Sequence, residues 1–130
     1  MGYIHAIAHT LGGRYGTPHG LANAVIMPYV LEAYGKSAHK KLRRLGLVAG
    51  VCAQEDTNEA GALKMIRAIR ELNAEMNIPD RLPGIQQEDI PMLAGRAEKE
   101  ANPLYPVPKL MTRRELETFY HRFADWRQDR

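Results

Sequence analysis

The chain has 130 residues, 45% of them hydrophobic and 25% charged, and a formal net charge of +3. This length and composition indicate one globular domain with a core of its own, and they exclude a disordered chain. The apolar runs are too short to cross a bilayer, so no membrane-spanning segment is expected. A single cysteine, Cys52, excludes an internal disulfide and favours the reducing cytoplasm.

The first stretch, residues 2–28, is rich in histidine and glycine. His5 and His9 are four residues apart, so a helix places both on one face. We expect the Gly12–Gly13 pair to end this helix and a tight turn to bring His19 back towards it. Three imidazoles in this arrangement could form part of a site for zinc, iron, copper or nickel, although histidines at this spacing are more often packed or surface residues.

Apolar residues that recur every three or four positions predict five more helices. Their approximate ranges are 20–34, 36–51, 58–76, 88–101 and 112–126. The first of these is so rich in Ala, Val, Ile and Leu that we expect it to be buried, with a kink at Pro28. The next two each carry one apolar stripe that is expected to face the core: Ala38, Leu42, Leu45 and Ala49, then Leu63, Ile66, Ile69, Leu72 and Met76.

Capping and turn signals set several helix boundaries. Thr57 or Asn58 is the expected N-cap of the helix that follows. Thr112 and Glu115 fit a capping box. The helix after that box has an expected inner face of Leu116, Phe119, Tyr120 and Phe123. Residues 102–108 are rich in proline and are expected to be extended.

The only basic cluster, residues 39–44, is interrupted by Leu42 at helical spacing. This pattern is typical of a solvated helix face, and we expect no nucleic-acid partner. His39 and His121 lie among charged residues and are expected at the surface. Because no segment has convincing strand character, we predict an all-α fold, a helical bundle.

The strings HAIAHTLGG and TPHGLANAVIMPYVLE, which begin at His5 and Thr17, together resemble the signature of the iron-containing (group III) alcohol dehydrogenases. Weaker similarity continues through IRELNAEMNIP and QQEDIPMLAGRAEKEANP to the closing TRRELETFYHRF segment. The resemblance covers essentially the whole chain, but only the carboxy-terminal part of the family's length. It implies that residues 1–130 are a single, partial helical metal-binding domain without the nucleotide-binding domain.

The resemblance also implies roles for the three histidines. His5 and His19 correspond to two ligands of the family's catalytic Fe2+, which is Zn2+ in some members. Helical spacing alone would instead pair His5 with His9. His9 corresponds to the catalytic histidine beside the nicotinamide ring of NAD(P), where it contacts the cofactor and is associated with proton relay.

The family's other two metal ligands, an Asp and a His, are expected upstream of this stretch. The glycines here do not follow a strand and open a helix, as a phosphate-binding turn requires. We therefore expect neither the metal nor NAD(P) to bind this chain well on its own.

Three functions remain open at this point. The first is the carboxy-terminal part of a metal-dependent, NAD(P)-linked alcohol dehydrogenase, which interconverts small alcohols and aldehydes and is inactive as an isolated chain. The second is a helical binding subunit completed by a partner chain. The third is a folded remnant without chemistry. The length of the resemblance favours the first.

A bundle without the family's opening helices should expose apolar surface around the helix that carries His5 and His9 and around residues 20–34, and such surface is commonly covered by self-association. We therefore predict that the chain is a homo-oligomer. Light scattering of the purified chain at micromolar concentration measures this directly, and a monomeric mass would contradict it.

Overall fold

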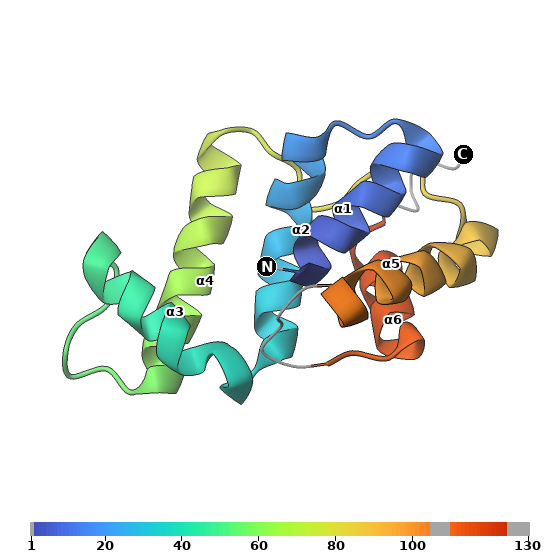
Figure 1. Cartoon of the computed structure of the whole chain (residues 1–130). Coiled ribbons are helices and arrows are strands. Elements are labelled where there is room, and N and C mark those ends of the chain that lie inside the picture. The colour runs from blue at the N-terminus through green and yellow to red at the C-terminus, as the bar shows by residue number, and fades with distance from the viewer. Residues whose placement is uncertain (1, 105–109, 125–130) are drawn as a thin grey trace.

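The computed structural model describes residues 2–104 and 110–124 (Figure 1). Within them the chain forms six α-helices and a short 3-10 helix, with no sheet beyond an isolated bridge between Leu82 and Ala124. The helices are α1 (Gly2–Tyr15), α2 (His19–Tyr34), α3 (Lys36–Ala49), α4 (Asn58–Glu75), α5 (Ile90–Leu104) and α6 (Arg113–Phe123), with η1 (Gln87–Asp89) before α5. The prediction of an all-α bundle is confirmed.

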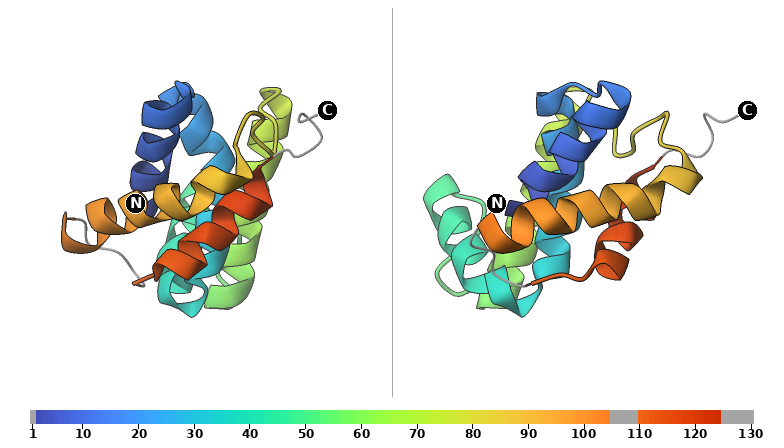
Figure 2. Two further views of the ribbon diagram at one scale, coloured as in Figure 1. Left: turned by 90° about the vertical axis from the view of Figure 1, so that its right-hand side faces the viewer. Right: turned by 45° about the vertical axis from the view of Figure 1, so that its right-hand side comes forward.

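Helix α2 lies in the middle of the molecule. Helices α3 and α4 pack on each other on one side of it, and α1, α5 and α6 gather on the other (Figures 1 and 2). Seven residues of α2 are buried, which confirms the expectation for this segment: Ala22, Val25, Ile26, Pro28, Val30, Leu31 and Tyr34. Pro28 lies inside the helix, which continues past it to Tyr34.

Helix α1 presents one fully buried side to α2 and α5. Its buried apolar residues are Tyr3, Ile4, Ala6, Ile7, Ala8 and Leu11. The facing side of α5 consists largely of small residues, with Leu93, Ala94, Ala97 and Ala101 all at 0% exposure. Small side chains at the contact let the axes of two helices approach closely.

Hydrogen bonds fix α1 along its length. Near its beginning, the Tyr3 hydroxyl accepts the backbone N–H of Met111 at 2.7 Å. In its middle, the buried Thr10 hydroxyl lies 2.7 Å from the Ile7 carbonyl and shares a hydrogen bond, also of 2.7 Å, with the hydroxyl of Tyr120. Burial raises the pKa of Tyr120, which keeps that hydroxyl protonated.

The end of α1 is tied to the start of α5. The Tyr15 hydroxyl donates to the Asp89 carboxylate at 2.8 Å, and the Arg14 guanidinium lies 3.2 Å from the same carboxylate. The helix is therefore attached at both ends and in the middle, and its rotation about its own axis is fixed.

The glycine pair does not end α1, contrary to the sequence expectation. The helix continues through Gly12 and Gly13 to Tyr15, and the backbone N–H of Gly16 still bonds to the Gly12 carbonyl at 3.0 Å. Gly16 has φ of +71°, the left-handed conformation in which helices commonly terminate. Glycine lowers the stability of a helix but does not by itself end it. Helix α1 ends where the backbone of Gly16 takes the left-handed conformation.

The predicted core stripe of α4 is only partly buried. Ile66 is 4% exposed, whereas Leu63 and Leu72 are each 53% exposed and Met76 is 54% exposed. Residues separated by steps of three drift around the helix by about 60° per step, so Leu63 and Leu72 lie on opposite sides. The same correction applies to α3, where Leu42 is buried and Leu45 is 52% exposed.

Exposed apolar surface is also not where the sequence placed it. Among the described residues, the large hydrophobic side chains that are exposed belong to α3, α4 and the segment before α6: Leu45, Val48, Leu63, Leu72, Met76 and Leu110. None belongs to α1 or α2, because α4, α5 and α6 cover the apolar sides of those helices. The premise of the oligomer prediction was therefore wrong, and the prediction itself stays untested.

Both predicted caps are present. Thr57 is the N-cap of α4 and accepts the Ala60 backbone N–H at 3.0 Å. Thr112 and Glu115 form the expected capping box, and the four residues of the α6 inner face are buried. Residues 102–104 belong to α5 instead of being extended, while residues 105–108 and Trp126 lie outside the described part of the chain.

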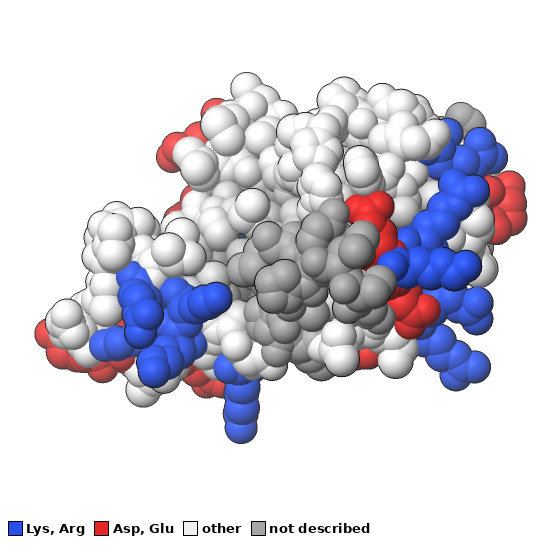
Figure 3. Space-filling model, viewed as in Figure 1, with Lys and Arg blue, Asp and Glu red and all other residues white. Residues whose placement is uncertain are grey.

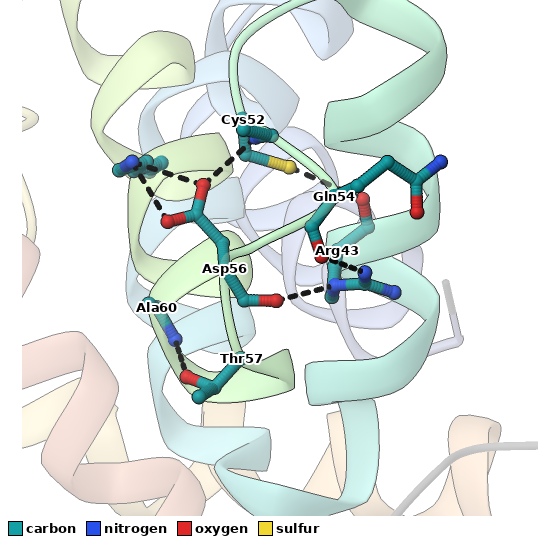
Figure 4. A network of polar contacts seen from close by, with 8 residues as sticks. Arg43, Cys52, Gln54, Asp56, Thr57 and Ala60 are labelled. Atoms are coloured by element: carbon teal, nitrogen blue, oxygen red, sulfur yellow. Dashed lines mark hydrogen bonds and ion pairs between the residues drawn. The ribbon is translucent and has the colours of Figure 1, made fainter.

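The turn between α3 and α4 is closed by polar contacts (Figure 4). The Arg43 guanidinium donates to the carbonyls of Asp56 and Gln54 at 2.8 and 2.9 Å. The Ala53 backbone N–H and then the Lys64 ammonium lower the pKa of the Asp56 carboxyl. Cys52 is a free, half-buried thiol beside this turn.

The basic cluster lies on α3, where Lys and Arg side chains gather at the lower left of Figure 3. Lys40, Lys41 and Arg44 are exposed and Leu42 is buried, as expected for a solvated helix face. In the part of the chain that the structure describes, no helix has both the length and the apolar character needed to span a membrane.

Glu32 joins three helices on the opposite side of α2 from α1. Its carboxylate accepts two hydrogen bonds of 2.8 Å from Arg70 of α4 and lies 3.8 Å from Arg122 of α6. Both guanidinium groups also lie over the Tyr29 ring, 5.9 and 5.3 Å from its centroid. The hydrogen bonds from Arg70 lower the pKa of Glu32 from its ordinary value of 4.5.

We predict that Glu32→Gln lowers the free energy of unfolding at pH 7 by about 0.5 kcal/mol, since partly exposed ion pairs contribute less than about 1 kcal/mol. Because the folded-state pKa is lowered, this stabilisation is complete well above pH 4.5 and is lost as the pH falls through the folded-state value. Urea unfolding of the variant and the parent measures the loss of stability at pH 7 and the disappearance of this difference at pH 3. Glu71→Gln, at an exposed position of α4, is the control; an equal effect of both variants at pH 7 would contradict the prediction.

Candidate functional site

The open side of α1 carries the residues that the sequence singled out. His5, His9, Gly12 and Gly13 follow one another at steps of four, three and one, which keeps them on one helix face. The opposite face is buried against α2 and α5. Since the hydrogen bonds of α1 fix its rotation, this face is held towards solvent.

His19 reaches the same place from the next helix. The left-handed Gly16 and the extended Pro18 reverse the chain, so α2 begins at His19. The centroid of the His5 ring lies 5.0 Å from that of His9 and 5.4 Å from that of His19. The structure therefore brings together all three histidines of the sequence hypothesis, with His5 between the other two.

A fourth residue, Glu100 of α5, joins this group. Its two carboxylate oxygens lie 3.1 and 3.2 Å from Nδ1 of His9. The sequence analysis missed it because the two residues are 91 positions apart. A short motif cannot pair positions so distant; only the packing of α5 on α1 does.

His9, His19 and Glu100 border a surface hollow of about 600 Å³ between α1, α5 and the start of α2, and the His5 ring lies next to the two other histidine rings. We call it the histidine hollow. Its polar border is formed by His9, Thr17, His19, Arg96 and Glu100. Gly12 and Gly13 line it as well, and a Cβ added at Gly13 would meet no atom within 4 Å. Gly13 therefore faces open space in the hollow, and no neighbouring atom packs closely against it.

Another hollow, of about 540 Å³, lies between α2 and α4. Two of its polar side chains already have partners in the protein. Arg70 is bonded to Glu32, and the Asn73 amide donates to the Ala24 carbonyl at 2.9 Å. The histidine hollow, with imidazoles and a carboxylate at its border, is the better candidate for chemistry.

The histidine cluster fits a divalent metal. An imidazole bound through nitrogen at about 2.1 Å has its centroid about 3 Å from the ion, so two such ligands at a tetrahedral angle have centroids about 5 Å apart. Both spacings from His5 meet this condition. Among the described residues, His5, His9 and Glu100 also offer donor atoms that all lie within 4.8 Å of one another. Imidazole nitrogen suits iron and zinc alike.

The chain matches a known protein family over nearly its whole length. The model of the Fe-containing alcohol dehydrogenase family, C-terminal part, matches residues 1–124. The chain belongs to the iron-containing alcohol dehydrogenase family. The match includes the three histidines and all six helices.

Several curated members of the family are similar in sequence. Alcohol dehydrogenase 4 of Saccharomyces cerevisiae is 43% identical over 105 residues, which are 78% of this chain and 26% of the yeast protein. Lactaldehyde reductase of Escherichia coli is 36% identical over 99 residues, 75% of this chain and 26% of that protein. The chain thus spans about a quarter of the length of these relatives.

Solved structures show the same fold. A 1,3-propanediol oxidoreductase superposes with a TM-score of 0.85 and 31% identity over 94% of this chain and 32% of its own. An alcohol dehydrogenase from Oenococcus oeni gives a TM-score of 0.84 and 27% identity over 95% of this chain and 33% of its own. The helical arrangement described here is therefore that of the carboxy-terminal part of family members.

We predict that Gly13→Ala raises the free energy of unfolding by about 0.5–1 kcal/mol, because alanine favours the helix and nothing obstructs its methyl group. Gly16→Ala is the matched comparison and should lower it by about 1 kcal/mol, since Gly16 is left-handed. Urea unfolding of the two variants and the parent measures both effects. A destabilising Gly13→Ala would mean that α1 does not continue through the glycine pair.

Proposed function

We propose that this chain supplies the helical, metal-binding part of a metal-dependent, NAD(P)-linked alcohol dehydrogenase that interconverts small alcohols and aldehydes. The observation that carries the proposal is the clustering of the His5, His9 and His19 rings, in a chain of the iron-containing alcohol dehydrogenase family. Two similar proteins are named for small hydroxylated compounds, lactaldehyde and 1,3-propanediol, which supports the substrate class.

In this proposal His5 and His19 hold the metal, Fe2+ or Zn2+, through ring nitrogens. The metal supplies polarisation of the alcohol or carbonyl oxygen, and NAD(P) supplies acceptance or donation of hydride. His9, whose side chain is 59% exposed at the border of the hollow, contacts the nicotinamide and acts as a catalytic proton carrier. An imidazole suits that task because one ring nitrogen can donate a proton while the other accepts one.

We infer that the isolated chain does not catalyse the reaction. Catalytic metal sites of this kind use at least three protein ligands and keep an open position, whereas His5 and His19 provide two. The chain also corresponds to about a quarter of its curated relatives, and the remaining ligands and the nucleotide site belong to the rest of such enzymes in this proposal. The single, free Cys52 suits the cytoplasm as the location.

Self-association stays a prediction. The exposed apolar side chains that could support it lie on α3 and α4, away from α1. Burial of such residues between two copies of the chain would stabilise a homo-oligomer by removing apolar surface from water.

We predict that the purified chain binds Fe2+ and Zn2+ weakly, and that His5→Ala and His19→Ala each reduce this affinity at least tenfold, since even partners outside the ligand set change metal affinity by about 10- to 100-fold. The measurement is an anaerobic calorimetric titration with each metal. A parallel assay follows NAD(P) reduction with 1,2- or 1,3-propanediol, and no turnover by the chain alone is expected.

His39→Ala is the control because His39 lies on α3, outside the histidine hollow. Equal loss of binding in this variant would show that the metal is held at unspecific surface histidines. Unchanged binding in the His5→Ala, His19→Ala double variant would contradict the assignment of ligands, and turnover by the isolated chain would contradict its inactivity.

A further inference from the structure

The contact between His9 and Glu100 has no role in the proposed function so far. Both carboxylate oxygens of Glu100 lie within hydrogen-bond distance of the same ring nitrogen, Nδ1, at 3.1 and 3.2 Å. The side chain of Glu100 is 26% exposed, so the contact is partly shielded from water. Partial burial strengthens such a charge-assisted hydrogen bond.

The chemistry of the pair defines the hydrogen position. An ionised carboxylate can only accept hydrogen bonds, so Nδ1 of His9 must carry the hydrogen and donate it. In the neutral imidazole this leaves Nε2 with the free electron pair. Without such a partner, a neutral histidine in water favours the opposite tautomer, with the hydrogen on Nε2.

We infer that Glu100 is a positioning residue for His9. It accepts the Nδ1 hydrogen, holds the orientation of the ring and makes Nε2 the nitrogen that can accept a proton in the histidine hollow. The use of Nε2 in catalysis depends on the proposed function, whereas the tautomer and the orientation depend only on the contact with Glu100.

The packing of α5 on α1 explains why this role falls to Glu100. Ala97 and Ala101 of α5 are fully buried, and Glu100, on the same helix, lies at the border of the histidine hollow. Arg96, one turn earlier on α5, borders the same hollow. Glu100 is thus carried on a rigid element next to a helix whose own rotation is fixed, which is the arrangement that orients a ring reproducibly.

The tautomer can be measured by nuclear magnetic resonance without any activity. The chain is labelled with 15N-histidine, freed of metal with EDTA and studied at pH 9, where imidazole is neutral. Long-range 1H–15N correlation of the His9 ring should show a protonated Nδ1 and an unprotonated Nε2 in the parent. Glu100→Ala should reverse the two, so that the Nδ1 resonance moves into the range of an unprotonated ring nitrogen.

Glu100→Gln tests whether the hydrogen-bond acceptor itself is responsible. Its amide oxygen can still accept the Nδ1 hydrogen, so the tautomer of the parent should be largely restored. Glu98→Ala is the matched control, because it removes the same charge two positions away on the same helix. The ring signals of His39 serve as an internal reference in every sample, and circular dichroism verifies folding.

A protonated Nε2 in the parent, or an equal change in Glu98→Ala and Glu100→Ala, would overturn the inference. These outcomes are separate from those of the metal titration. If Glu100→Ala changes the His9 tautomer but the His5→Ala and His19→Ala variants keep their metal affinity, the positioning role stands and the proposed function fails. If the two histidine variants lose metal affinity but Glu100→Ala leaves the His9 tautomer unchanged, the proposed function stands and the positioning role fails.

Discussion

The structure depends on the rotational setting of α1. This helix has one side at or near complete burial and one side that carries His5 and His9, and the two must not exchange. Its large buried side chains, Tyr3, Ile7 and Leu11, fix this setting in part by packing. The buried hydrogen bond between Thr10 and Tyr120, with the ties at Tyr3 and Tyr15, adds a directional constraint. The functional face is therefore set in part by polar groups on the opposite face.

Much of this fold could be predicted from the sequence, for identifiable reasons. The capping box at Thr112 and the N-cap at Thr57 are local patterns in which side chain and backbone meet within four residues. The proximity of His5, His9 and His19 follows from one helix face and one turn. The spread of apolar residues around α4 could not be assigned to core or solvent, because the sequence does not show that its partners are α2 and α3 alone.

The glycines show the limit of reading residue types without conformation. Gly12 and Gly13 form an obvious pair of breakers, yet the chain stays helical through both and ends at Gly16. What separates them is the sign of φ, which composition does not reveal. Gly13 is the more informative residue for function, because neither a left-handed backbone nor a close neighbour requires glycine there. A side chain at this position would border the histidine hollow.

The same reasoning connects the helix contact to the chemistry. His9 and Glu100 lie on different helices, so the distance between their side chains is set by how closely α1 and α5 approach. Ala97 and Ala101 of α5 are fully buried, and their small side chains let neighbouring helices pack closely. A larger side chain at either position would disturb the packing of α5 and with it the hydrogen bond to Nδ1. The orientation of the His9 ring therefore depends in part on buried residues of α5 that have no polar atom in the side chain.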